Sequence, residues 1–128
     1  MKTRTSIALA IVAGFGLGAV SIHTLHAQAK PPVFTISEID VTNPDAYAKE
    51  YVSKAQALIR KNGGRIIAAS SNVTVIEGKG PKRLAIQQWD SMEKLKAHYA
   101  TAEYKELRKV GNKYAKFNIV AVDGVPQP

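Results

Sequence analysis

The order of strand-like and helix-like segments constrains the fold of this chain more than any other feature of its sequence. Between residues 33 and 122, segments rich in β-branched side chains and segments with helical periodicity follow one another as β-α-β-β-α-(α)-β. The simplest packing for this order is an antiparallel sheet with both helices on one of its faces. The sequence therefore predicts a small α+β domain.

The first strand and the first helix have clear local signals. Val33–Val41 is rich in β-branched residues and predicts a strand. Asn43 offers a side-chain oxygen as N-cap, and Pro44 stands at the first helical position, where its missing N–H costs nothing. Gly63-Gly64 then ends the helix, because glycine adopts the left-handed C-cap conformation at low cost. We expect this helix over residues 44–62.

The remaining segments complete the predicted order. Asp90 or Ser91 is expected to cap the next helix, and Thr101 to cap a further helical segment after it. Residues 73–77 are expected as a strand segment, either in a hairpin or as a bent continuation of the strand before it. The other expected elements are strands at residues 65–69, 83–89 and 117–122 and the last helical segment at residues 102–113.

Together these elements match the ferredoxin-like βαββαβ arrangement, in which one face of the antiparallel sheet carries no helix. A second copy of the sheet would bury that face for both chains, so we expect a two-fold homodimer. Alternation along residues 83–89 leaves open whether Leu84 or Ala85 belongs to the dimer face.

The N-terminal segment differs in composition from the rest of the chain. Two positive charges are followed by 17 uncharged residues, Ser6–Ile22, and then by the small-residue sequence Ala27-Gln28-Ala29. This order is typical of a secretory signal peptide. The alternative is an uncleaved membrane anchor, although the stretch is shorter than the ~20 residues that span a bilayer. We expect cleavage of residues 1–29, a periplasmic or secreted domain over residues 30–128, and no stable membrane anchor after cleavage.

The charge and the cysteine count exclude several classes of protein. Two of the 18 basic residues lie in the predicted signal, so 16 remain against 10 acidic residues and the exported domain has a net charge of +6. The sequence has no cysteine, which excludes disulfides, thiol catalysis, cysteine-based zinc sites and iron–sulfur clusters. Such a domain depends on packing, within one chain or between subunits.

Several short motifs occur in a distinctive order along the predicted exported domain. They are Asp40–Tyr47, Gly63-Gly64-Arg65, Glu77-Gly78, Trp89–Glu93 and Glu103-Tyr104-Lys105. In this order they resemble the domain of unknown function 1330 family, and its exported members in particular. The resemblance implies a dimeric α+β barrel, in a superfamily that includes small monooxygenases, lactone isomerases and haem-binding peroxidase relatives. It implies a dimer and a cavity between sheet and helices, but no particular activity.

Glu77 and His98 are the candidate catalytic residues. Glu77 is expected at a strand end, where a desolvated carboxylate at a cavity mouth can act as a general base; the alternative is a solvated strand end. His98, the only histidine of the predicted exported domain, could be a proton shuttle or a haem ligand, but the preferred interpretation is a histidine on the helix surface. One histidine without cysteine does not make a zinc site, so we expect no metal.

Aromatic and basic residues supply the candidate binding site. Aromatic side chains could line a pocket for a flat apolar ligand, and basic side chains could bind its carboxylate. The alternative is plain core packing, with the hydroxyl groups reaching the surface. The candidates are Tyr47, Tyr51, Trp89, Tyr99, Tyr104, Arg65 and Arg83.

A run of basic residues towards the C-terminus is a pattern that also occurs in nucleic-acid-binding proteins. Because the domain is expected to be exported, we expect no nucleic-acid partner and interpret the run as a solvated helix face. The run consists of Lys105, Arg108, Lys109, Lys113 and Lys116.

Three functions remain open from the sequence. The leading hypothesis is an exported homodimer that binds a small apolar or aromatic molecule in its cavity, without a cofactor. The second is a cofactor-free isomerase or monooxygenase-like enzyme that uses Glu77 or His98 with tyrosines. The third is a structural or partner-binding envelope protein. An enclosed pocket reached by Glu77 or His98 would favour the enzyme, and a filled core would favour the third hypothesis.

Overall fold

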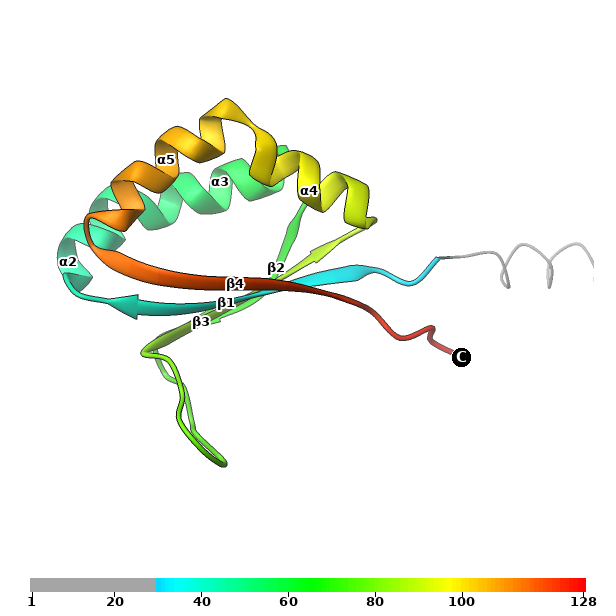
Figure 1. The fold of residues 1–128 in the computed structure, drawn as a ribbon, viewed down its shortest axis with the longest axis horizontal. Coiled ribbons are helices and arrows are strands. Elements are labelled where there is room, and N and C mark those ends of the chain that lie inside the picture. Colours follow the sequence, from blue (N-terminus) through cyan, green and yellow to red (C-terminus); the bar gives the residue numbers. More distant parts are fainter. Residues whose placement is uncertain (1–29) are drawn as a thin grey trace, which may run out of the picture. The chain divides into compact units, whose positions relative to one another are not determined.

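The computed structural model describes residues 30–128, in which helices cover one side of a four-stranded sheet (Figure 1). The export signal predicted for residues 1–29 lies outside the described residues. Within residues 30–128, no helix has the length and apolar character needed to cross a membrane. The strands are β1 (Val33–Val41), β2 (Arg65–Ser70), β3 (Arg83–Trp89) and β4 (Ala115–Asp123). The helices are α2 (Pro44–Tyr47), the π-helical segment η1 (Ala48–Val52), α3 (Ser53–Lys61), α4 (Met92–Ala100) and α5 (Ala102–Asn112).

The sheet is antiparallel in each of its strand pairs and has the order β2-β3-β1-β4. β1 therefore lies between β3 and β4, and the helices cover the same face of the sheet (Figure 1). This arrangement confirms the predicted α+β, ferredoxin-like fold. α2, η1 and α3 follow one another without a break, so they form the single first helix that the sequence predicts.

Local signals position the helices. Asn43, Ser91 and Thr101 each accept a hydrogen bond with their side-chain oxygen from the backbone N–H three residues later, at 3.1–3.2 Å. Of the two predicted caps for α4, the structure thus selects Ser91. Gly63 has a φ of +93° and follows α3 in the left-handed conformation that glycine favours. These caps fix where each helix begins and ends, and hence which side chains turn toward the sheet.

The core between sheet and helices divides into two clusters of buried residues. The Trp89 cluster consists of Val33, Ile59, Trp89 and Leu95. The Tyr51 cluster consists of Ile39, Tyr47, Tyr51 and Ala115. β1 contributes to both clusters, with Val33 as its first residue and Ile39 near its last, so the clusters lie at opposite ends of this strand.

Residues 71–82 form a loop, so the strand predicted at residues 73–77 is wrong. The loop projects from the sheet on the side away from the helices (Figure 1), and Ile76 within it is 92% exposed. β-Branched residues favour a strand only where a neighbouring strand supplies hydrogen bonds. The four strands of the described sheet pair with one another and leave this segment without such a neighbour.

The sheet face away from the helices is uncovered in the single chain, and much of it is apolar. Val120 and Val122 on β4 are 51% and 49% exposed. The strand register also decides which residue of β3 belongs to this face. Leu84 lies opposite Glu38 on the uncovered face, whereas Ala85 lies opposite the buried Ser37 and faces the helices.

Candidate functional site

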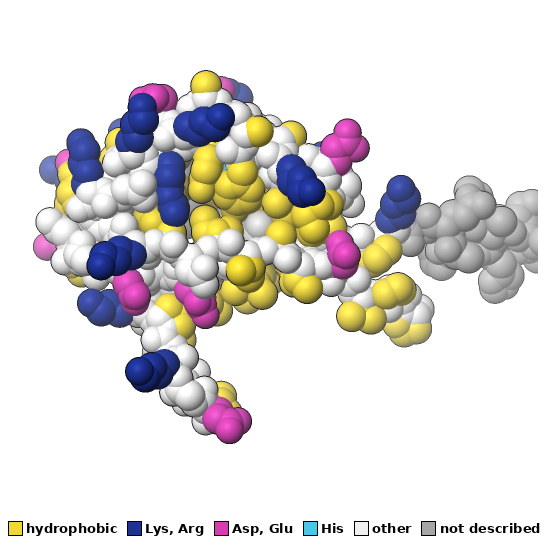
Figure 2. Space-filling view, in the orientation of Figure 1, with side chains coloured by type: hydrophobic (Ala, Val, Ile, Leu, Met, Phe, Trp, Pro, Cys, Tyr) yellow, Lys and Arg dark blue, Asp and Glu magenta, His cyan; other side chains and the backbone are white. Residues whose placement is uncertain are grey.

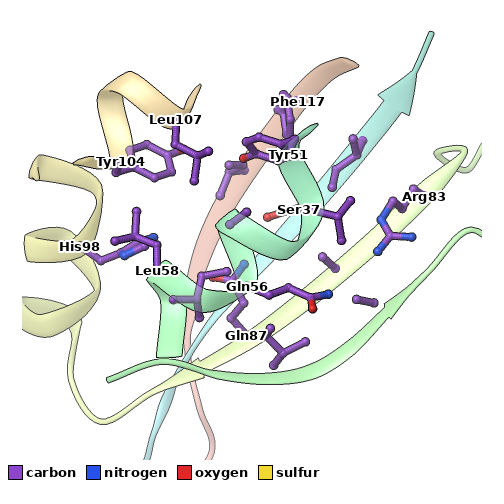
Figure 3. Close-up of a pocket in the computed structure, with 18 of the residues that line it drawn as sticks. Ser37, Tyr51, Gln56, Leu58, Arg83, Gln87, His98, Tyr104, Leu107 and Phe117 are labelled. Carbon is purple, nitrogen blue, oxygen red and sulfur yellow. The ribbon is translucent and has the colours of Figure 1, made fainter. Parts of the chain in front are cut away.

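A cavity lies between the sheet and the helices (Figure 3). Each of the four strands contributes to its lining, as do the first helix, α4 and α5. The cavity has a volume of about 660 Å³ when its part open to solvent is included. Within it, the centres of water molecules can occupy about 70 Å³. Hydrophobic side chains are visible between the helix layer and the sheet, flanked by basic side chains of the helices (Figure 2).

Most of the site residues predicted from the sequence come together at this cavity. They are Tyr47, Tyr51, Arg83, His98, Tyr99 and Tyr104. The part around His98, which borders the Trp89 cluster, is called the Trp89 end below. The part around Tyr47, Tyr51 and Phe117 is called the Tyr51 end.

Trp89, Arg65 and Glu77 do not reach the cavity. Trp89 is 1% exposed and lies against His98, with ring centroids 4.9 Å apart. Arg65 is exposed and pairs with Gln88. Because successive side chains of a strand alternate between faces, this pair lies on the sheet face away from the helices. Glu77 is exposed on the loop between β2 and β3, so the strand end expected at a cavity mouth does not form.

The buried polar groups at the Trp89 end form a chain of hydrogen bonds. The indole N–H of Trp89 donates to the Thr35 hydroxyl at 3.4 Å, and that hydroxyl donates to Gln87 Oε1 at 2.9 Å. Thr35 is fully buried and Gln87 is nearly so. Polar groups that are both buried and partnered hold a core in one arrangement. These hydrogen bonds therefore fix the side of the cavity that Gln87 lines.

His98 is only 2% exposed, so its interpretation as a surface histidine is wrong. Leu95 and His98 lie three residues apart on α4 and therefore share the face that turns toward the sheet. The Asn62 side-chain amide donates to Nδ1 of His98 at 2.9 Å, which leaves the proton of the neutral ring on Nε2. Burial lowers the pKa of His98, and the ring is therefore uncharged at neutral pH.

Two tyrosines enclose the histidine ring within the cavity. The ring centroids of Tyr99 and Tyr104 lie 4.9 and 5.2 Å from that of His98. Burial raises the pKa of Tyr104 to about 12, so its hydroxyl stays protonated and can donate a hydrogen bond. The Trp89 end therefore combines aromatic surface with neutral polar groups.

Arg108 belongs to the Tyr51 end, although the sequence prediction assigned it to a solvated basic face. Its Cζ lies 3.4 Å from the centroid of the Phe117 ring, and its Nη1 is buried without a hydrogen-bond partner. Arg108 follows the cavity residue Tyr104 by four positions, so helical periodicity places it on the inner face of α5. That periodicity is the sequence signal that identifies Arg108, and the surrounding lysines obscure it.

Two arginines act on the tyrosine hydroxyls at the Tyr51 end. Burial raises the pKa of Tyr47 and of Tyr51, and nearby guanidinium groups partly offset this rise. Arg83 lowers the pKa of Tyr47 more than Arg108 does, and Arg108 acts on both hydroxyls. The ring centroids of Tyr51 and Phe117 are 5.5 Å apart. This end therefore presents hydroxyl groups and positive charge beside aromatic rings.

Acidic side chains do not balance this charge. The lining of the cavity contains no aspartate or glutamate. The ion pairs within residues 30–128 join Lys61 to Glu103, Lys94 to Asp90 and Lys109 to Glu106, so Arg83 and Arg108 have no carboxylate partner in this range. The same residues contain no group of three histidine, aspartate or glutamate side chains that could hold a metal ion.

Several solved structures share this fold at low sequence identity. A protein of unknown function from Rhodopseudomonas palustris matches with a TM-score of 0.63 at 10% identity, covering 84% of this chain and 94% of that one. SnoaB, a cofactor-independent oxygenase from Streptomyces nogalater, matches with a TM-score of 0.57 at 10% identity, covering 76% and 96%. A dimeric protein of unknown function with a ferredoxin-like fold from Bacteroides fragilis matches with 0.51 at 12% identity, covering 72% and 95%.

These neighbours establish the fold, whereas the sequence establishes the family. A comparison with curated proteins gives no match. The model of one family matches residues 32–125, which is nearly the whole of the described range. The match confirms the resemblance seen in the short motifs, and the chain belongs to the family described as a domain of unknown function (DUF1330).

Proposed function

We propose that this protein binds a small apolar or aromatic molecule in the cavity between its sheet and its helices. The observation that supports this most strongly is the lining, which is mainly aliphatic and aromatic with a few polar tips. Ligand sites in proteins commonly have this character, because the apolar surface provides affinity and the polar groups set orientation. The aromatic residues at the two ends, Tyr51 and Tyr104, are both part of this lining (Figure 3).

The size of the cavity limits the ligand. Its inner space of about 70 Å³ is smaller than the roughly 150 Å³ of an engineered cavity that binds benzene. A molecule with one ring therefore fits if part of it remains at the solvent side or if a lining ring turns aside.

A cavity-filling substitution tests this proposal. Ala55 lines the cavity, whereas Ala57 on the same helix is exposed. We expect small one-ring compounds to raise the melting temperature of the wild type and of Ala57→Leu, but not of Ala55→Leu, where the leucine occupies the space. Calorimetry and thermal shift with one compound panel measure both effects. A wild type whose melting temperature responds to no compound would refute ligand binding.

A cofactor-independent enzyme is the second candidate, and buried His98 is the observation that favours it. Its neutral ring lines the cavity, and if the Asn62 amide turned over to accept the Nδ1 proton, Nε2 could act as a base. SnoaB, one of the structural neighbours, is a cofactor-independent oxygenase. If this candidate is right, the protein consumes oxygen with electron-rich phenols in the absence of added metal or flavin, and His98→Gln stops the reaction while ligands still bind. If the wild type shows no such activity, the enzyme candidate is wrong and only the binding function remains.

We further propose a homodimer formed through the uncovered sheet face. One structural neighbour is a dimeric protein with a ferredoxin-like fold, and the 71–82 loop with its exposed Ile76 projects on the same side of the sheet (Figure 1). A second copy would remove this apolar surface from water. The apolar residues of the face are Phe34, Ile36, Leu84, Ile86, Val120 and Val122.

Charge substitutions on the sheet test the dimer. Leu84→Asp places a carboxylate on the uncovered face and should release monomers, whereas Lys105→Asp on the exposed side of α5 should leave the dimer intact. Ala85→Asp faces the cavity and should reduce stability instead of dissociating the dimer. Light scattering measures the assembly, and a wild type that is monomeric at micromolar concentration would refute the proposal.

The proposed place of action is the periplasm or the extracellular space, after removal of residues 1–29. The charged start, the apolar stretch and the Ala27-Gln28-Ala29 sequence support this proposal. N-terminal sequencing of the protein from its own cells should begin at Lys30 or Gln28. Recovery of chains that begin at Met1 from the membrane fraction would contradict it.

A further inference from the structure

Two positively charged side chains lie at the same end of the cavity. Arg83 pairs across the sheet with Ile39, and Ile39 pairs on its other side with Phe117, so the three side chains form one row on the helix-facing side. Two strand spacings separate the ends of this row, about 10 Å between the backbones of Arg83 and Phe117. Arg108 stacks on Phe117 from the helix layer. Arg83 therefore lines the Tyr51 end, and the guanidinium group of Arg108 lies against Phe117, which also lines it.

The partners of these two arginines are incomplete. Nη1 of Arg108 is buried and has no hydrogen-bond partner. Arg83 is only partly buried and has neutral hydroxyl partners: it donates to Ser71 at the long distance of 3.4 Å, and the Tyr47 hydroxyl also lies within its hydrogen-bonding reach. Removing a cation from water is unfavourable unless an anion or hydrogen-bond acceptors replace the water. The described residues supply no carboxylate at this place.

We infer that the Tyr51 end binds the carboxylate of a small organic acid, with the apolar body of the acid inside the cavity. This inference rests on the proposed binding function and specifies the chemical class of its ligand. Arg83 and Arg108 provide planar donor groups that match the two oxygens of a carboxylate. The hydroxyl of Tyr51 adds a further donor, and Phe117 and Leu107 provide apolar contacts. Because Arg108 is not part of the lining, its guanidinium group must turn into the cavity for a carboxylate to give the free Nη1 its missing acceptor.

Matched acid and amide probes test the inference, because each pair has nearly the same shape and differs in charge. The pairs are acetate and acetamide, butyrate and butyramide, and benzoate and benzamide. We expect at least one acid to bind the wild type about tenfold more tightly than its amide in calorimetric titration, as charge-assisted hydrogen bonds are stronger than neutral ones. Arg108→Met and Arg83→Met should each reduce this preference to about threefold or less. Lys105→Met removes one charge from the exposed side of α5 and should retain the full preference.

The possible results separate the inference from the function on which it rests. If acids and amides bind with equal affinity, the inference is wrong and the binding function stands. If an acid is preferred but the preference survives in both arginine variants, the Tyr51 end is not the anion site and the inference is also wrong. If neither these probes nor the compounds of the wider panel bind, the inference and the proposed function both fail. Circular dichroism of each variant distinguishes a lost preference from a lost fold.

Discussion

The two ends of the cavity treat their buried polar groups differently. At the Trp89 end, the indole N–H has Thr35 as acceptor at 3.4 Å and Nδ1 of His98 has Asn62 as donor at 2.9 Å. At the Tyr51 end, Nη1 of Arg108 is equally buried but has no partner. A buried polar group without a partner costs stability, and its partner is commonly a water molecule, an ion or a ligand. This difference supports the proposal that a ligand binds at the Tyr51 end, while the Trp89 end holds the core together.

Each end also has one glycine packed against an aromatic ring. A Cβ on Gly64 would lie 2.8 Å from the ring of Trp89, and a Cβ on Gly111 would lie 2.7 Å from the ring of Tyr51. The ring of Trp89 belongs to the closed core, whereas the ring of Tyr51 borders the cavity. The same substitution at the two glycines should therefore have unequal effects, and this offers a way to compare the ends.

The largest difference between the ends should appear when one large side chain is removed from each. Trp89→Ala should cost about 3–5 kcal/mol of unfolding free energy, because it empties a fully buried site. Arg108→Met should change it by no more than about 1 kcal/mol, since the lost stacking on Phe117 is offset by removal of an unpartnered donor. Urea unfolding followed by circular dichroism measures both. A loss of stability in Arg108→Met that equals the loss in Trp89→Ala would show that Arg108 is a structural residue.

The glycine substitutions should give the next largest difference. Gly64→Ala should cost about 1–3 kcal/mol, because the closed core cannot accept the added methyl group without displacement. Gly111→Ala should cost less, since the Tyr51 ring can turn into the cavity and alanine favours the helix more than glycine does. The displaced ring should at the same time weaken the binding of any ligand that stabilises the wild type. The comparison fails if Gly111→Ala is the more destabilising variant.

The sequence predicts the fold well because its strongest signals are local. The Asn43-Pro44 start of the first helix and the glycines that end it act through the backbone of their own turn, without help from distant residues. The prediction of a strand at residues 73–77 is wrong because β-branched side chains do not indicate whether a neighbouring strand exists. The same limit applies to Glu77, whose expected place depended on that strand.

The site was less predictable, because burial of a polar side chain depends on several elements at once. The sequence favours a surface position for His98, because polarity is the only property that a single position reveals. Its burial follows from the rings of Trp89, Tyr99 and Tyr104, which come from a strand and two helices. Arg108 was hidden among surface lysines, yet its spacing from Tyr104 indicates the inner face of α5.

The smallest predicted difference concerns the stability of the Trp89 end in acid. Burial lowers the pKa of His98, so as the pH falls the unfolded chain takes up the proton before the folded protein does. The unfolding free energy should therefore fall once the pH drops below about 6.5, the pKa of an unperturbed histidine, until the lower pKa of the folded state is passed. His98→Gln should remove this contribution. Urea unfolding between about pH 7.5 and pH 5 measures it, and identical pH profiles for the two proteins would contradict it.

On the proposed function, ligands bind at the Tyr51 end and leave the Trp89 end undisturbed. Nuclear magnetic resonance tests it most directly, because the guanidinium N–H signals of Arg83 and Arg108 and the indole N–H signal of Trp89 can be followed in one titration. With benzoate, or with the acid that binds most tightly, we expect saturable shifts of both arginine signals and little change in the indole signal. Shifts that are largest at the Trp89 indole and the His98 ring, with unchanged arginine signals, would contradict the account.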